Sequence, residues 1–260
     1  AAGRLQYRYH PRWEEVRARR KAERLAGFAA ALPAIRRAVV RDLSAPAGER
    51  SLALAAVVEL VTFTAIRAGG EAYARAHGTR GAATLLKSNL RPREGRLVLS
   101  FRAKGGRRAA GEIADARFIG VVERLRQLPG PRLFQYRDAA GETRAVRAAD
   151  VNAYLQQIAG KPVSLKDFRT LVASAGVLDA LAGAPPASSA RGRSAQVATA
   201  VRAAADLLQN TPTVCRRSYV LPAVVAAFED GTLARFAAAL KRCRSPARRA
   251  AILAELIRQA

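Results

Sequence analysis

The residues best suited to chemistry lie in the segment Asn210–Tyr219, which reads NTPTVCRRSY. Tyr219 is expected at the end of a short helix, directly behind Arg216 and Arg217. A phenol with a pKa of about 10 is a poor nucleophile at neutral pH, and guanidinium groups both favour its anion and bind phosphate. The combination indicates covalent chemistry on a nucleic-acid backbone. Taken alone, the segment favours a simpler interpretation, a helix with a solvated arginine pair and a half-buried tyrosine.

Cleavage of a phosphodiester through a covalent intermediate needs an in-line nucleophile, cations that stabilise the phosphorane and a general acid for the departing hydroxyl. Arginines can supply that charge without a metal. Arg67 follows an expected buried helix at a glycine turn, and Lys104 lies at the tip of an expected hairpin. Lys166 and Arg169 stand three residues apart in KDFRT, on one face of a helix. Asn210 adds an uncharged amide donor.

Each of these residues also has an explanation without chemistry. Arg67 would extend from a core helix into water, and Lys104 would be a solvated turn lysine. The segment 166–170 would start a helix with an internal ion pair, and Asn210 would cap the helix that follows it. Their joint occurrence in this order favours the catalytic interpretation.

The elements that must position these residues are mainly helical. Residues 12–43 predict two helices, the second opened by Pro33, and 51–66 a core helix. A period near two between 83 and 114 predicts a small three-stranded antiparallel sheet, with KGGRR as a tight turn. The fold class is therefore mainly α with a small antiparallel sheet (α+β). The sheet strands are expected at 83–90, 96–103 and 109–114, a short helix around Tyr73, further helices at 115–128, 148–159, 166–182, 191–209, 212–228 and 246–259, and a loop at 183–194.

Charge and composition limit the classes of partner that the chain can bind. The chain of 260 residues has 45 basic and 20 acidic residues, a net charge of +25. Such a surface attracts DNA, RNA or anionic lipid with strongly salt-dependent affinity. Two cysteines and two histidines are too few for a metal cluster or a disulfide framework. No apolar run reaches membrane-spanning length, and no secretory signal is visible.

Four segments, 66–90, 103–106, 166–170 and 210–219, together resemble the type IB DNA topoisomerases, in particular the compact poxvirus and bacterial branch. The resemblance extends from about residue 6 to residue 234. It implies the tyrosine recombinase/topoisomerase IB catalytic fold, with a nucleophile, two phosphate-clamping arginines, a general acid and an asparagine in place of the poxvirus histidine. In that order, the residues implied are Tyr219, Arg67, Arg169, Lys104 and Asn210. The residues expected to contact DNA are Tyr73, Arg80, Lys87, Lys166, Arg216 and Arg217.

The chain departs from the family pattern at two local positions. Ala65 replaces an arginine before the first catalytic arginine turn, and the run 220–222 reads Val-Leu-Pro where bacterial members often have Ile-His-Pro. The chain is also expected to start after the family's small β-rich N-terminal domain. We therefore expect one catalytic domain over 1–260, with an N-terminal helical part at 1–50, a core at 51–234 and a helical tail at 235–260.

The resemblance implies an enzyme that nicks one strand of double-stranded DNA, holds the 3′-phosphate on Tyr219, lets the free end rotate and reseals the strand. It implies no ATP, metal or small-molecule cofactor, and we expect a monomer in the bacterial cytoplasm, at the nucleoid and not at a membrane. One alternative is a tyrosine recombinase or integrase, although those enzymes usually have a His-x-x-Arg box where Lys166 and Arg169 stand here. The other is a DNA-binding module with weak turnover because the N-terminal clamp is missing.

Overall fold

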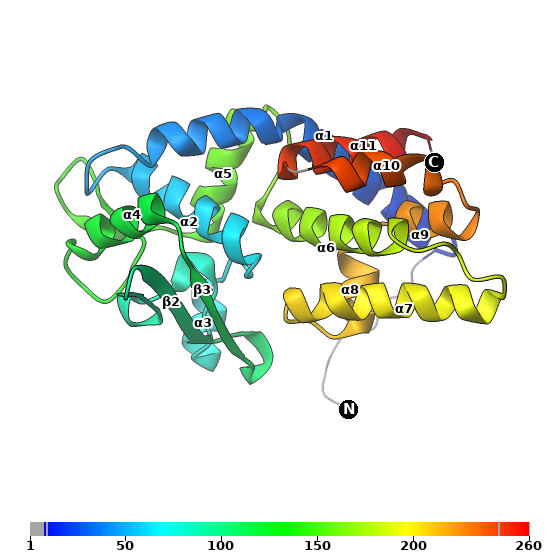
Figure 1. Cartoon of the computed structure of the whole chain (residues 1–260). Coiled ribbons are helices and arrows are strands. Elements are labelled where there is room, and N and C mark those ends of the chain that lie inside the picture. The colour runs from blue at the N-terminus through cyan, green and yellow to red at the C-terminus, as the bar shows by residue number, and fades with distance from the viewer. Residues whose placement is uncertain (1–7, 9, 244, 260) are drawn as a thin grey trace.

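The computed structural model describes residues 8, 10–243 and 245–259. Two long helices, α1 (Trp13–Asp42) and α6 (Leu165–Ala182), pack against each other in this fold. α1 crosses the top of the molecule in Figure 1 and packs against α2 (Arg50–Thr64), α5 (Ala148–Ala159), α6 and α11 (Pro246–Gln259). The apolar residues that recur every three or four positions in α1 are buried, as expected for a helix with one face on the core; they are Leu25, Phe28, Leu32, Ile35 and Val39.

Pro33 lies inside α1, so the prediction of two helices over residues 12–43 is wrong. A proline inside a helix removes one backbone hydrogen bond and usually ends or kinks the helix. Here Leu32, before the proline, and Ile35, after it, are both buried in the core. Because residues on both sides of the proline pack on that same core, tertiary contacts hold the helix through it.

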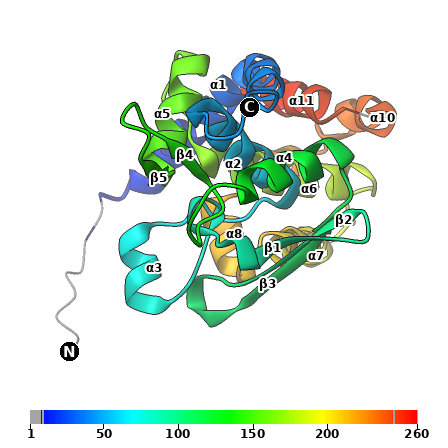
Figure 2. The same ribbon diagram turned by 90° about the vertical axis from the view of Figure 1, so that its left-hand side faces the viewer.

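The predicted three-stranded antiparallel sheet is confirmed, with the strand order β1-β2-β3. Its strands are β1 (Leu90–Arg93), β2 (Arg96–Arg102) and β3 (Arg108–Ile113), and Figure 2 shows them beside α3 (Glu71–His77). The first strand starts at residue 90 rather than 83, because two single 3₁₀ turns, η1 (Ala82–Thr84) and η2 (Lys87–Asn89), precede it. The Thr84 and Asn89 side chains accept hydrogen bonds from nearby backbone N–H groups, which favours a turn over a strand.

A second sheet of two short strands, β4 (Gln135–Arg137) and β5 (Thr143–Ala145), lies beyond the predicted helix α4 (Ala116–Arg126). No pattern in the sequence predicted this second sheet. Each strand has three residues, which is too short for the alternation of apolar and polar residues that reveals a strand.

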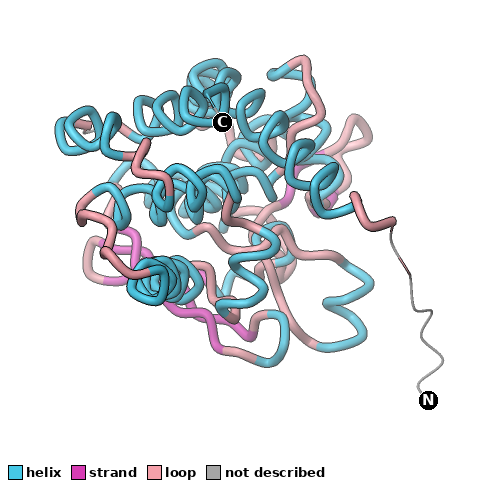
Figure 3. The backbone as a smooth tube through the Cα atoms, turned by 90° about the vertical axis from the view of Figure 1, so that its right-hand side faces the viewer, coloured by secondary structure: helices cyan, strands magenta, loops and turns pink. Residues whose placement is uncertain are grey.

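The predicted helix over 212–228 is two helices, α8 (Pro212–Ser218) and α9 (Pro222–Glu229). Pro222 disfavours helical backbone at the residue before it, and Leu221 is extended, with φ −76° and ψ 131°. Tyr219 therefore lies at the break between two helices. Figure 3 shows the helical half of the molecule, α6 to α11, from the side where these helices face the viewer. It also contains α7 (Ala190–Leu207) and α10 (Ala234–Arg242), and α10 lies as a separate helix within the expected helical tail at 235–260.

One hydrophobic cluster joins the half of the molecule that contains the two sheets to the helical half, α6 to α11. It includes Phe28 of α1, Leu60 of α2, Phe168 of α6 and Leu253 of α11. Within the part of the chain that the structure describes, no helix is long and apolar enough to cross a membrane. The same described residues contain no group of three or more His, Cys, Asp or Glu side chains suited to a metal ion.

Candidate active site

A small pocket lies where the end of α2, the β2–β3 hairpin, α6 and the end of α7 meet. Its lining includes four basic residues from separate parts of the chain, Arg67, Arg80, Lys104 and Arg169. Three of these are predicted catalytic residues and Arg80 is a predicted DNA contact. The fold therefore brings together side chains that are far apart in the sequence.

Arg67 is fixed by its backbone. The turn that follows α2 lies against residues 81–83, and the Arg67 carbonyl accepts a hydrogen bond of 2.8 Å from the N–H of Ala82. A Cβ atom at Gly81 would lie 2.6 Å from the Arg67 carbonyl oxygen and 2.5 Å from the Gly69 nitrogen. Real Cβ atoms do not approach backbone so closely, so this contact requires glycine at 81 and holds Arg67 in place.

Arg169 is the most enclosed of the predicted catalytic side chains, with 3% of its surface exposed. Its guanidinium donates to the backbone carbonyls of Ala65 and Leu208. The guanidinium carbon lies 4.8 Å from the centre of the Tyr219 ring. Burial lowers the pKa of Arg169 from its usual value, and the charge of Arg67 adds to this, whereas Tyr219 opposes it. Arg169 thus links the α2 turn, the end of α7 and the tyrosine.

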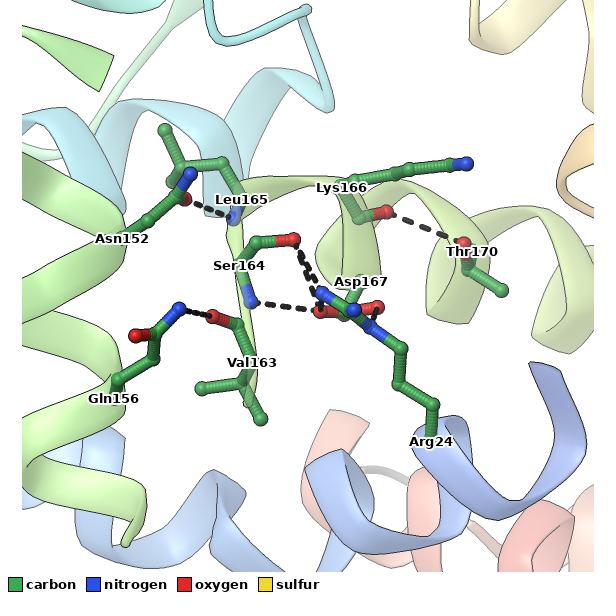
Figure 4. Close-up of polar contacts among 9 residues, drawn as sticks. All are labelled: Arg24, Asn152, Gln156, Val163, Ser164, Leu165, Lys166, Asp167 and Thr170. Carbon is green, nitrogen blue, oxygen red and sulfur yellow. Dashed lines mark hydrogen bonds and ion pairs between the residues drawn. The ribbon is translucent and has the colours of Figure 1, made fainter. Parts of the chain in front are cut away.

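The start of α6 separates a structural carboxylate from two basic residues. Asp167 accepts hydrogen bonds from the Ser164 backbone N–H at 2.7 Å and from Arg24 of α1 at 2.7 and 2.8 Å. Figure 4 shows Asp167 directed toward Arg24, with the exposed Lys166 side chain extending away from that pair. The ion pair therefore joins α6 to another helix and is not internal to the KDFRT segment.

Asn210 contacts the site through its side-chain oxygen, which accepts a hydrogen bond from the Arg67 guanidinium. Its amide nitrogen is buried, and no described residue forms a hydrogen bond with it. The N-cap of α8 is Thr211, whose hydroxyl accepts a bond of 3.3 Å from the Val214 N–H. The explanation of Asn210 as the cap of that helix is therefore wrong.

Tyr219 is half-buried at the C-terminal end of α8. Two residues that the sequence analysis missed hold the backbone around it. Ser174 of α6 donates to the Tyr219 carbonyl at 2.9 Å, and Lys21 of α1 donates to the carbonyls of Arg217 and Val220. A buried helical serine and one basic residue among many on α1 carry no signal in the sequence.

Lys104 occupies the tip of the β2–β3 hairpin, in the 3₁₀ turn η3 (Lys104–Gly106). Gly105 and Gly106 have φ angles of 80° and 77°, a region that glycine enters readily and other residues rarely enter. The Lys104 ammonium lies 5.4 Å from the centre of the Tyr73 ring. The two residues therefore stand together, and Lys104 also lines the pocket.

The remaining predicted DNA contacts lie away from this pocket. The Lys87 ammonium donates to the Leu128 carbonyl. Arg216 and Arg217 line a different pocket, between α1, α7, α8 and α9, and Arg217 pairs with Glu14 at 3.1 Å. The guanidinium beside the phenol is thus that of Arg169, which no sequence spacing connects to Tyr219.

Comparisons with known proteins show the family of the chain. Residues 11–244 match the family described as "Eukaryotic DNA topoisomerase I, catalytic core", and this range contains all five predicted catalytic residues. The chain is also 30% identical over 226 residues to the "DNA topoisomerase 1B" of Acanthamoeba polyphaga mimivirus, an alignment that covers 84% of this chain and 67% of the viral protein. Both matches favour a topoisomerase over a recombinase. The chain belongs to the type IB DNA topoisomerases.

Proposed function

We propose that this chain relaxes supercoiled double-stranded DNA by cutting one strand, holding its 3′-phosphate on Tyr219 and resealing it after rotation. The observation that carries this proposal is the position of Arg169, which lines the pocket with Arg67 and Lys104 and lies over the Tyr219 ring. A nucleophile, two fixed cations and a proton donor are the groups that transfer of a phosphodiester requires.

Each group has one role in the proposed reaction. The Tyr219 phenol gives its proton to water as its oxygen attacks the phosphorus and displaces the 5′-oxygen, which takes a proton from Lys104. Arg67 and Arg169 neutralise the nonbridging oxygens of the phosphorane, and Asn210 donates a neutral hydrogen bond. The energy of the broken phosphodiester is retained in the phosphotyrosyl ester, so resealing reverses the same steps without ATP. Because arginines stabilise the charge, we propose that no metal or small-molecule cofactor takes part.

Two unpaired donors support a phosphate at this site, one on Arg169 of the pocket and one on Asn210, which contacts Arg67. The Arg169 Nε and the Asn210 Nδ2 are both buried and have no hydrogen-bond partner among the residues that the structure describes. Leaving a buried donor unpaired costs about 1–3 kcal/mol, so such groups are uncommon unless a ligand pairs with them. The nonbridging oxygens of a phosphodiester are suitable acceptors.

We also propose that the protein is a monomer that acts at the bacterial nucleoid. Its one catalytic domain would consist of an N-terminal helical part at 1–50, a core at 51–234 and a helical tail at 235–260. The predominance of arginine over the six lysines of the chain is typical of GC-rich coding sequences. The DNA-contact residues proposed are Tyr73, Arg80, Lys87, Lys166, Arg216 and Arg217.

Plasmid relaxation in the presence of EDTA and without ATP tests the function. The expected products are topoisomers that lose supercoils progressively, with a covalent protein–DNA adduct after denaturation. Recombined or integrated products would favour the recombinase instead. Retarded plasmid without any relaxation would favour the DNA-binding module.

We predict that activity falls steeply with salt. A net charge of +25 makes phosphate neutralisation the main source of affinity. A protein that contacts about 6–10 phosphates loses about 10³- to 10⁵-fold in affinity between about 50 and 200 mM salt. Relaxation should therefore be detectable at low salt and become distributive as salt rises, which a plasmid assay over a salt series measures. Processive relaxation at high salt would contradict this prediction, and thermal unfolding over the same series controls for loss of fold.

We predict that Asn210→Ala slows cleavage about tenfold, less than the loss of either arginine. The change removes one neutral hydrogen bond, worth about 0.5–1.5 kcal/mol, together with the acceptor for Arg67. Asn210→His should retain activity, because an imidazole can also serve as a donor and an acceptor. Single-turnover cleavage of a labelled duplex measures both variants. An unchanged rate in Asn210→Ala would exclude Asn210 from the catalytic set.

A further inference from the structure

The end of α8 is held by side chains from two other helices. The Lys21 ammonium of α1 donates to the carbonyls of Arg217 at 2.9 Å and Val220 at 3.1 Å. From α6, the Ser174 hydroxyl donates to the Tyr219 carbonyl at 2.9 Å and accepts from the Leu221 N–H at 3.2 Å. The backbone before, at and after the tyrosine is therefore bound to elements outside α8.

α8 needs such support because it is short. It has seven residues, and helices of this length are marginal by themselves. The last carbonyls of a helix have no partner within the helix, and a cation near them also interacts favourably with the helix dipole. Lys21 bonds the Arg217 carbonyl in the last turn of α8 and the Val220 carbonyl just beyond the helix, so it meets both needs on either side of Tyr219.

Lys21 does not line the pocket that contains Arg67, Lys104 and Arg169. It lines a separate pocket of about 900 Å³, whose walls come from α1, α7, α8 and α9. Lys21 thus reaches the tyrosine's backbone from outside the catalytic pocket. A role in contacting the reacting phosphate is not needed to explain its position.

We propose that Lys21 is a positioning residue for the nucleophile, which fixes the end of α8 so that the Tyr219 oxygen stands in line with the phosphorus in both cleavage and resealing. The proposal rests on Tyr219 as the nucleophile. Displacement of a reacting group by about 1 Å can cost about 10²-fold in rate, so a short helix with a loosened end loses rate while the DNA-binding surface is retained.

The charge of Lys21 gives this role a pH dependence. Burial, together with the charges of Arg17 and Lys166, lowers the pKa of Lys21 from 10.5 to about 8, with Glu14 and Cys215 acting in the opposite direction. Arg217 and Arg216, which line the same pocket from α8, add positive charge there, as does Arg202 of α7, and Glu229 of α9 adds a negative one. A charged donor bonds a carbonyl about twice as strongly as a neutral one. The hold on α8 is therefore strongest below pH 8 and weakens above it.

The lowered pKa of Lys21 also makes the stability of the fold depend on pH. The pKa in the folded state lies below the unfolded value, so the unfolded state binds more protons between about 8 and 10.5. The contribution of Lys21 to stability thus rises with pH across that window, and its charged form is a cost below pH 8. Replacement of Lys21 by an uncharged side chain of similar length should therefore leave the fold intact.

Lys21→Met tests the proposal in single-turnover cleavage of a labelled duplex, with Kd for the duplex measured separately. We expect cleavage about 10²-fold slower, an unchanged Kd and no fall in Tm. Lys21→Arg, which keeps the charge and the donors, should recover most of the rate. The cleavage rate of wild type divided by that of Lys21→Met should fall toward one as pH rises through about 8. Lys241→Met, at an exposed position on α10, is the matched control and should cleave normally.

Several outcomes would overturn the proposal. Equal cleavage rates for wild type and Lys21→Met would show that α8 needs no support from Lys21. A weakened Kd that accounts for the whole effect would make Lys21 a DNA contact, and a rate ratio independent of pH would separate the effect from its charge. Tyr219→Phe in the same assay separates failure of the proposed function from failure of the role of Lys21. Covalent product from Tyr219→Phe would refute the proposed reaction on Tyr219. Absence of covalent product from Tyr219→Phe, together with a normal cleavage rate of Lys21→Met, would refute only the role of Lys21.

Discussion

Tyr219→Phe is expected to abolish both DNA relaxation and the covalent protein–DNA adduct while leaving DNA affinity nearly unchanged. The substitution removes only the phenolic oxygen. The ring can keep its place 4.8 Å from the Arg169 guanidinium carbon, and the backbone carbonyl keeps its bond to Ser174. No other nucleophile among the predicted catalytic residues replaces a phenol, since the rest are arginine, lysine and asparagine.

Three measurements together identify the nucleophile: plasmid relaxation, adduct formation on denaturing gels and a binding assay. Tyr136→Phe is the matched control, because it removes a phenolic oxygen from a partly buried tyrosine on β4, in the other half of the molecule. That variant should relax DNA at the wild-type rate. An adduct that persists in Tyr219→Phe would mean that another residue attacks the phosphorus.

The sequence predicted most of the helices and the sheet because their patterns are local. The apolar residues of α1 recur every three or four positions, and α2 is nearly all apolar, so both patterns predict helices that are buried on the core. The errors fall where distant contacts decide. Pro33 stays within a helix because both sides of it pack on the core, and the fold alone pairs β4 with β5.

The candidate site shows the same division. Motifs along the chain predicted Arg67, Lys104 and Arg169 as a set, and the structure places all three around one pocket. The sequence could not show which guanidinium faces the phenol. It placed Arg216 and Arg217 nearest to Tyr219, whereas the fold brings Arg169 there from another helix. The supports from Lys21 and Ser174 were likewise invisible, because hydrogen bonds to backbone carbonyls leave no pattern of residue types.

Lys104→Ala is expected to slow cleavage by about 10²- to 10⁴-fold, the usual loss when a proton donor is removed. Lys104 is exposed at the tip of the hairpin, and its ammonium lies near the Tyr73 ring rather than in an ion pair with a carboxylate among the described residues. It is therefore available to give a proton to the departing 5′-oxygen. Single-turnover cleavage of a labelled duplex measures the loss.

A duplex with sulfur in place of the bridging 5′-oxygen separates proton donation from charge. A thiolate leaves without a proton, so the sulfur substrate should restore most of the rate lost in Lys104→Ala. Arg67→Ala is the control, because Arg67 stabilises the phosphorane and its loss should persist with either leaving atom. The same lack of rescue in Lys104→Ala would mean that Lys104 acts through its charge alone. In that case the pocket would hold three cations for the phosphorane, and the general acid would have to be sought elsewhere.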